Sequence, residues 1–228
     1  ALGLRFLDKE GKILETGNGK ILMEVVSIDT SFVHPDLRTS HFTVACDVQN
    51  PFYGLEGAAY IFAPQKGADR KMVEALDAGM KNFAEVIFHT TGKDISNHSG
   101  TGAAGGMGGS LLAFLNAKLK PGIQLMLETL DFSNKIKGTD LIITGEGKAD
   151  KQTLMGKVPS GILDKARKPK IPVILIAGSV ENADDLHRAG FRGVYSINPP
   201  SITLEQAMQP EVARANISET VVEICRSF

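Results

Sequence analysis

The chain has 228 residues, of which 43% are hydrophobic and 22% are charged, a composition that is ordinary for a globular protein. Its formal net charge of −1 at pH 7 gives no general attraction to nucleic acid or to an anionic membrane, so any anion site must be local. The sequence has no apolar run near the roughly 20 residues that span a bilayer, and no secretory signal region. We therefore expect a cytoplasmic protein without membrane or nucleic-acid partners.

The first 95 residues mix short strand-like segments with loops and contain one long helical pattern. Short strands are expected at residues 4–7 and 42–46. From Asp69 to His89, apolar residues recur every three to four positions, which predicts an amphipathic helix with Asp69 as its N-cap. We assign residues 1–95 to a smaller α/β domain.

The remaining residues alternate between strands and helices. Uniformly apolar strands are expected at residues 140–144, 171–177 and 193–197. Helices are expected at residues 110–119, 123–130, 161–168, 183–189 and 211–226. Strands this apolar are buried on both faces, and their alternation with helices calls for a parallel sheet. We assign residues 96–228 to a Rossmann-like α/β domain, so the predicted fold class is α/β with two domains.

Ligands of an open parallel sheet bind beyond the carboxyl ends of its strands. In this sequence those ends are TGEGKAD (residues 144–150), AGS (residues 177–179) and NPP (residues 198–200). The first end and the residues after it carry polar and charged side chains, namely Glu146, Lys148, Asp150, Gln152, Thr153 and Lys157. Polar side chains that continue from Glu146 as far as Lys157 favour a functional site. The alternative is a solvated turn between strand and helix.

A glycine-rich run, SGTGAAGGMGGS (residues 99–110), leads into a helix. Glycine permits positive φ and close backbone approach, and a helix N-terminus attracts anions. We therefore expect this run to contact a phosphate or a carboxylate through Gly100, Thr101, Gly102, Gly105 and Gly106. The alternative is that the glycines allow a tight contact between the helix and its neighbours.

The same run contains the pattern G-x-G-x-x-G, starting at Gly100, which is typical of nicotinamide cofactor binding. That motif needs a buried strand before its first glycine, whereas residues 93–99 are polar. Its acidic partner should end a second strand, yet Glu128 and Asp131 fall in or at the end of a helical pattern. An NAD(P)-dependent hydroxy-acid oxidoreductase is therefore kept only as an alternative.

Asp47 is one of the best polar candidates in the N-terminal half, together with His34 and Asp36. Asp47 ends the strand expected at residues 42–46 and precedes the turn signal Asn50-Pro51. A carboxylate at such a place can hold Mg²⁺ through water or take a proton from a substrate hydroxyl. The alternative is an aspartate that caps a turn.

Several motifs occur here in an order that resembles the bacterial glycerate kinases over nearly the whole chain. They are FVHPDLR (residues 32–38), ACDVQNPFYGL (45–55), GAAYIFA (57–63), PQKGAD (64–69), GTGAAGGM (100–107), KPG (120–122) and DLIITGEGKADKQTLMGK (140–157). The resemblance implies two α/β domains, one inserted in the other, with the substrate cleft between them. It also implies ATP- and Mg²⁺-dependent phosphorylation of D-glycerate, at the 2-hydroxyl, to give 2-phosphoglycerate.

Complete members of that family are longer than this sequence. The resemblance implies an additional N-terminal third with an Asp-x-x-Lys segment and a Gly-Gly-Ser-Ala-Thr loop, and neither occurs here. We therefore expect a glycerate kinase that lacks its N-terminal part. An inactive fragment or pseudoenzyme that binds a small acid is a further alternative.

Residue chemistry suggests roles in phosphoryl transfer, where positioning and charge neutralisation do most of the work. Backbone N–H groups of the glycine run would bind a phosphate or the glycerate carboxylate, and Asp47 would orient or deprotonate the hydroxyl. We predict that the catalytic residues are Asp47, Asp150 and Lys157, that the metal ligands are Glu146 and Asp150, and that Lys148, Gln152 and Thr153 join the glycine run in binding phosphate or substrate.

Overall fold

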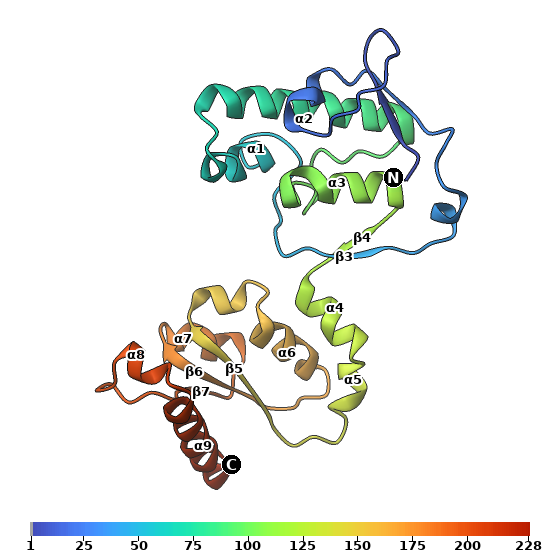
Figure 1. Cartoon of the computed structure of the whole chain (residues 1–228). Helices are drawn as coiled ribbons and strands as arrows, with labels where there is room; N and C mark the ends of the chain where they lie inside the picture. The colour runs from blue at the N-terminus through green and yellow to red at the C-terminus, as the bar shows by residue number, and fades with distance from the viewer. Residues whose placement is uncertain (1) are drawn as a thin grey trace. The chain divides into compact units, whose positions relative to one another are not determined.

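The computed structural model describes residues 2–228, which form two compact units, one ending at Gly122 and the other running from Ile123 to Phe228 (Figure 1). This division falls later in the chain than the expected boundary at residue 95, because the glycine-rich run packs within the first unit. The smaller domain was expected to begin at Ala1, which lies outside the described residues. No helix in residues 2–228 has the length and apolar character needed to cross a bilayer.

The first unit combines two small sheets with helices, some of them 3-10 helices (η). In chain order its elements are β1 (Arg5–Leu7), η1 (Gly19–Met23), β2 (Ser27–Asp29), η2 (Pro35–Arg38), β3 (Thr43–Ala45), α1 (Ala58–Phe62), η3 (Pro64–Lys66), α2 (Arg70–Thr91), α3 (Ala103–Leu115) and β4 (Lys118–Lys120). β1 pairs with β2 in antiparallel fashion, and β3 pairs with β4 in parallel.

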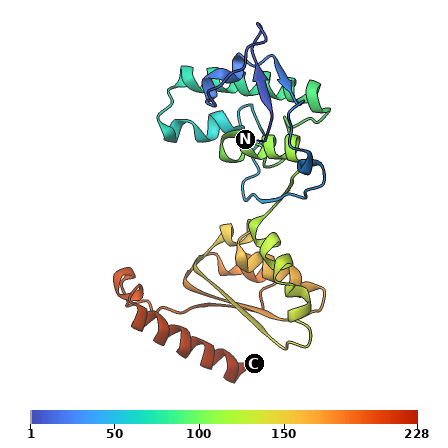
Figure 2. The same ribbon diagram turned by 45° about the vertical axis from the view of Figure 1, so that its right-hand side comes forward.

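The long helix α2 confirms the amphipathic pattern. Its N-cap is Asp69, whose Oδ1 accepts a hydrogen bond from the backbone N–H of Met72 at 2.8 Å. Its apolar face buries Met80 and Ile87, and α1 and α3 lie on the same side of α2 in two views (Figures 1 and 2). The core of the first unit therefore forms between these helices, around Phe52.

The helix expected at residues 110–119 differs from the one in the structure. α3 ends at Leu115, where Asn116 takes a left-handed conformation with φ of 52°. The following residues form β4 instead of a last helical turn, because the strand β3 offers backbone partners: Lys118 N–H donates to Phe42 O at 2.9 Å, and Cys46 N–H donates to Lys120 O at 2.8 Å.

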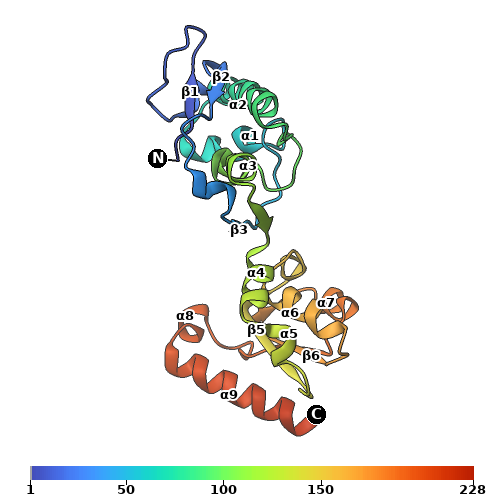
Figure 3. The ribbon, with the colours of Figure 1, turned by 90° about the vertical axis from the view of Figure 1, so that its right-hand side faces the viewer.

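The second unit has the expected parallel α/β architecture. Its elements are α4 (Gly122–Thr129, which begins at the last residue of the first unit), α5 (Phe132–Lys135), β5 (Ile142–Ala149), η4 (Lys151–Leu154), α6 (Val158–Arg167), β6 (Val173–Val180), α7 (Ala183–Ala189), β7 (Gly193–Ser196), α8 (Leu204–Ala207) and α9 (Pro210–Ser227). The strands are parallel in the order β5-β6-β7. α6 and α7 cover one face of this sheet, and α9 lies on the other side (Figures 1 and 3).

Two of the strands run further than the sequence predicted. β5 continues to Ala149 and β6 to Val180, so the glycine-containing segments at 144–150 and 177–179 lie largely inside the ladder. The glycines permit this, since a Cβ on Gly178 would lie only 2.7 Å from Gly147 O. The true carboxyl end of β5 is therefore at Ala149 and Asp150.

Candidate functional site

A connected group of polar side chains lies at the end of β5. Thr153 donates its hydroxyl to Oε1 of Glu146, and Lys157 places its Nζ 3.8 Å from Oε2 of the same carboxylate. Thr153 is fully buried, and the Glu146 side chain is only 14% exposed. Glu146 is thus a nearly buried carboxylate whose two oxygens face a hydroxyl and a half-exposed ammonium group.

Asp150 joins this group through a capping box at the start of η4. Its Oδ1 accepts a hydrogen bond from the N–H of Gln152 at 2.8 Å, and its own N–H donates to Oγ1 of Thr153 at 3.0 Å. Thr153 therefore links Glu146 with the backbone of Asp150. The structure brings together four residues that the sequence singled out, and Gln152 contributes to the cap through its backbone.

Lys148 belongs to the same strand but has a different partner. Its Nζ lies 2.8 Å from Oε1 of Glu181, which follows the end of β6. This hydrogen bond and the negative charge of Glu181 raise the pKa of Lys148, so the ammonium group stays charged at neutral pH. Lys148 and Lys157 place two positive charges near the end of β5.

The predicted metal ligands differ in how well their contacts suit Mg²⁺. Residues 2–228 contain no group of three or more His, Cys, Asp or Glu side chains arranged to hold a metal ion. Mg²⁺ often binds through one or two carboxylates together with water and substrate phosphates. Glu146 already faces the cation Lys157, whereas Asp150 uses only Oδ1 in its cap. Of the two, Asp150 fits the ion.

Most glycines of the run at residues 99–110 are needed for close packing. A Cβ on Gly102 would lie 2.3 Å from Pro51 O, and one on Gly106 would lie 2.8 Å from Phe52. On Gly100 it would lie 2.9 Å from Cys46 Sγ. Of the glycines predicted to contact ligand, only Gly105 faces open space, with φ of 74°. The tight-contact alternative therefore accounts for most of them.

Thr101 also has an internal role. Its side chain is fully buried, and its hydroxyl donates to His98 O at 2.7 Å, while its carbonyl accepts from Gly109 N–H at 2.9 Å. These bonds stabilise the loop before α3. Residues 93–99 form no strand, so the context that the nicotinamide motif requires is missing in this part of the structure.

The start of α3 has an unusual backbone. Ala104, Gly105 and Gly106 are successive residues with left-handed φ values of 51°, 74° and 100°, and regular helix follows from Met107. Glycine takes such values readily, whereas alanine is strained there. The N-terminus of the regular helix and the exposed Gly105 are the parts of the run that suit an anion.

Asp47 lies just beyond the end of β3, in the first unit, whereas the group around Glu146 belongs to the second. Oδ1 of Asp47 accepts a hydrogen bond from the N–H of Gly122 at 2.7 Å, at the first residue of α4. This contact is with the start of a helix 75 positions away, and not with the turn that follows Asp47 in the sequence. Asp47 is also exposed, so its carboxylate is accessible from solvent.

A cavity of about 800 Å³ lies in the second unit where β6 and β7 end. It includes the two strand ends that the sequence indicated, at Ser179 and at Asn198. Sequence reasoning missed its other wall, which α9 provides through residues such as Thr220 and Glu223. In the sequence, the polar residues of α9 look like the solvent-exposed face of any surface helix, so no pattern indicated that they line a cavity.

Comparison with known proteins places these features in a family. The chain matches the model of the glycerate kinase family over residues 1–228. It is 42% identical to the glycerate kinase of Bacillus cereus, a match that covers 98% of this chain and 58% of that protein. It is 41% identical to the glycerate 2-kinase of Escherichia coli, covering 92% of this chain and 55% of that protein.

The fold agrees with this similarity. A crystal structure assigned as a glycerate kinase 2 from Salmonella typhimurium superposes with a TM-score of 0.79 at 38% identity, covering 99% of this chain and 60% of that one. The chain therefore spans between 55% and 60% of the length of these three relatives. The sequence match over all 228 residues and the shared fold lead to one conclusion: the chain belongs to the glycerate kinase family.

Proposed function

We propose that this protein transfers the γ-phosphoryl group of ATP to the 2-hydroxyl of D-glycerate, giving ADP and 2-phosphoglycerate. The family and the names of the relatives support the reaction class. The observation that carries the proposal is the group of Glu146, Thr153 and Lys157 at the carboxyl end of a parallel sheet, where such sheets bind ligands. The cytoplasm, with its ATP pool, is the proposed location.

Lys157 is the proposed electrostatic catalyst. Charge develops on the phosphoryl oxygens during transfer, and a fixed cation stabilises that charge. The Glu146 carboxylate, held in turn by the Thr153 hydroxyl, keeps the ammonium group in place before the substrate arrives. Glu146 is therefore a positioning residue for Lys157, and Lys148 supplies a second positive charge for the phosphates.

Asp150 is the residue that would hold Mg²⁺, through Oδ2, because the capping hydrogen bond uses only Oδ1. When bound, the ion neutralises charge on the phosphate oxygens of the nucleotide. Asp150 itself is kept in position by the bond between its N–H and Thr153. The proposed role of Asp150 is therefore to hold the ion at the end of β5, where it would add to the charge neutralisation by Lys157.

In the first unit, the proposed roles belong to Asp47 and to the start of α3. The 2-hydroxyl oxygen forms the new bond to phosphorus as the bond between phosphorus and the ADP oxygen breaks, and the hydroxyl proton must leave. The exposed carboxylate of Asp47 accepts that proton. The glycerate carboxylate interacts with the N-terminus of the regular part of α3, near Gly105.

The test is an assay of ADP release that depends on D-glycerate. It is run on the 228-residue chain, and on the same residues joined to the part of the Escherichia coli glycerate 2-kinase that lies outside the match. Enolase added to the products consumes 2-phosphoglycerate but not 3-phosphoglycerate, so it identifies the hydroxyl that was modified. A folded chimera that releases no ADP with D-glycerate contradicts the proposal.

A further inference from the structure

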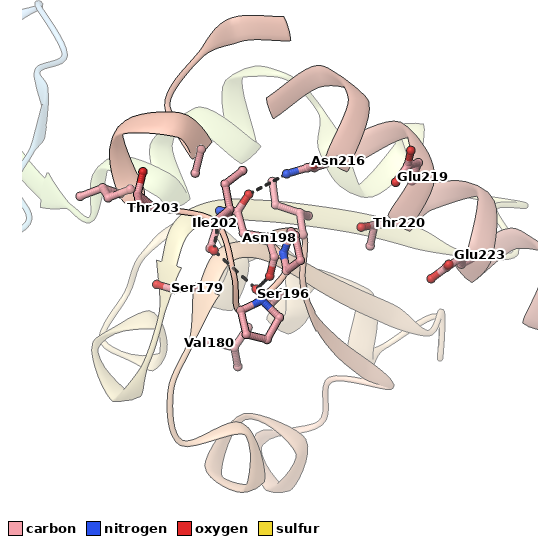
Figure 4. Close-up of a pocket in the computed structure, with 16 residues that line it drawn as sticks. Ser179, Val180, Ser196, Asn198, Ile202, Thr203, Asn216, Glu219, Thr220 and Glu223 are labelled. Atoms are coloured by element: carbon pink, nitrogen blue, oxygen red, sulfur yellow. Dashed lines mark hydrogen bonds between the residues drawn. The ribbon is translucent and has the colours of Figure 1, made fainter. Parts of the chain in front are cut away.

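The cavity at the ends of β6 and β7 has no role in the mechanism above. Its volume of about 800 Å³ lies within the range of about 300–1,000 Å³ that is usual for small-molecule sites. The strand ends Ser179, Ser196 and Asn198 line one side, and α8 and α9 line the other (Figure 4). All of its walls belong to the second unit.

Hydrogen bonds connect the two walls of the cavity. Asn216 on α9 donates its Nδ2 to Oδ1 of Asn198 at 2.9 Å, and Asn198 donates its Nδ2 to Gly178 O at 2.8 Å. Figure 4 shows both asparagines between the strand ends and the helix. Because side chains from both walls are bonded to each other, the cavity is formed before any ligand binds.

The charge of the lining disfavours an anion. Among the described residues around the cavity there is no lysine or arginine, whereas Glu219 and Glu223 place two carboxylates on α9. Within residues 2–228 neither carboxylate has a hydrogen bond or an ion pair. A phosphate or the carboxylate of glycerate would be repelled here. A ligand with hydroxyl or N–H donors would be attracted.

The spacing of the α9 residues places them on one helix face. Asn216, Thr220 and Glu223 lie four and seven positions apart, and Glu219 is next to Thr220. Carboxylates of this kind accept hydrogen bonds from the hydroxyls of a ribose in nucleotide sites. Other residues of the lining are apolar, among them Pro199, Pro200 and Ile202, and they offer a surface for a planar base.

The cavity also lies next to one of the two lysines near the end of β5, Lys148. Its residue Ser179 in β6 is directly opposite Lys148 in β5, and neighbouring strands are about 4.8 Å apart. A chain of phosphates that leaves the cavity beside Ser179 thus reaches a positive charge after crossing a single strand. A nucleotide has both of the groups that these two places suit: an uncharged nucleoside for the cavity and anionic phosphates for the end of β5.

From this arrangement we infer that the cavity binds the nucleoside part of a purine nucleoside triphosphate. The ribose hydroxyls donate to Glu219 and Glu223, and the base packs against apolar lining residues such as Ile202. The phosphates extend across β6 toward Lys148 and Lys157. The inference rests on the proposed function for its choice of a nucleotide, and it assigns the donor, not D-glycerate, to this cavity.

The experiment measures binding of adenosine and of tripolyphosphate to the 228-residue chain by calorimetry, without D-glycerate or turnover. In the double variant Glu219→Gln, Glu223→Gln, adenosine binding should weaken at least tenfold while tripolyphosphate binding does not weaken. The matched control is Glu205→Gln, an exposed glutamate on α8 that does not line the cavity, and it should leave both affinities within twofold.

Two results would overturn the inference: adenosine that does not bind the chain, or adenosine whose binding is unchanged in a double variant with an unaltered circular dichroism spectrum. These results are separate from a failure of the proposed function. If adenosine binding depends on the two glutamates but no D-glycerate is phosphorylated, the nucleoside site is supported and the proposed reaction is wrong. If D-glycerate is phosphorylated but the double variant binds adenosine as tightly as the unaltered chain, the proposed reaction is supported and the nucleoside site is wrong.

Discussion

Thr153 shows how one buried hydroxyl organises a charged group. Its Oγ1 accepts from the N–H of Asp150 and donates to Glu146, which in turn faces Lys157. The sequence identified all four residues from their types and their position after an apolar strand. It did not indicate which of them contact each other, because that depends on where β5 ends and η4 begins.

Lys157→Met should lower kcat for D-glycerate phosphorylation by about 100- to 1,000-fold, because it removes a fixed charge that acts on the transition state. The control is Lys151→Met, since Lys151 lies close by but pairs with Asp185 instead of Glu146. The measurement is ADP release by the chimera. A loss of similar size in both variants would argue against a specific role for Lys157.

Thr153→Val should destabilise the second unit by about 1–3 kcal/mol, because it leaves the N–H of Asp150 and the carboxylate of Glu146 without their buried partner. Urea unfolding followed by circular dichroism measures the effect. Thr129→Val is the comparison, since the Thr129 hydroxyl is exposed and bonds only to Leu125 O in its own helix. Its change should stay within about 0.5 kcal/mol.

Among the elements, α3 is the one whose sequence was hardest to interpret. Glycine-rich loops that bind phosphate and glycine-rich helices that pack closely have the same composition. What separates them is the neighbour, and Phe52 and Pro51 are about 50 residues away in the chain. Helices with a clear period, such as α2, and apolar strands, such as β6, were predictable because their pattern is local.

Gly106→Ala should destabilise the first unit by about 2–4 kcal/mol, because it adds a strained left-handed residue and a clash with Phe52. Gly105→Ala is the matched change, since its φ is also positive but its added Cβ meets open space. That variant should cost only about 1–2 kcal/mol. Equal losses in urea unfolding would contradict the packing role of Gly106.

At the scale of the whole chain, the α/β class was predictable and the division into units was not. The composition and the strand–helix alternation gave the class. The boundary depends on which core the glycine-rich run joins, and in the structure it joins the core around Phe52. The second core, around Leu175 and Leu186, is built only from residues of the second unit.

Because that core is self-contained, residues 123–228 should fold when expressed alone. Circular dichroism should show α/β content with a cooperative thermal transition, and hydrogen exchange should protect the amides of β6. The isolated unit should also retain adenosine binding, since all walls of the cavity belong to it. A chain without a cooperative transition would show that this unit needs the first one to fold.

The close approach of Gly147 and Gly178 has a consequence for which residues these two positions can accept. A Cβ on Gly178 would lie 2.7 Å from Gly147 O, whereas a Cβ on Gly147 would meet no atom within 4 Å. Two facing glycines should thus differ in mutational tolerance. In a saturation library selected for folded protein, position 178 should stay glycine while position 147 accepts alanine and serine. Here the backbone of β5 restricts which residue types the neighbouring strand β6 can carry.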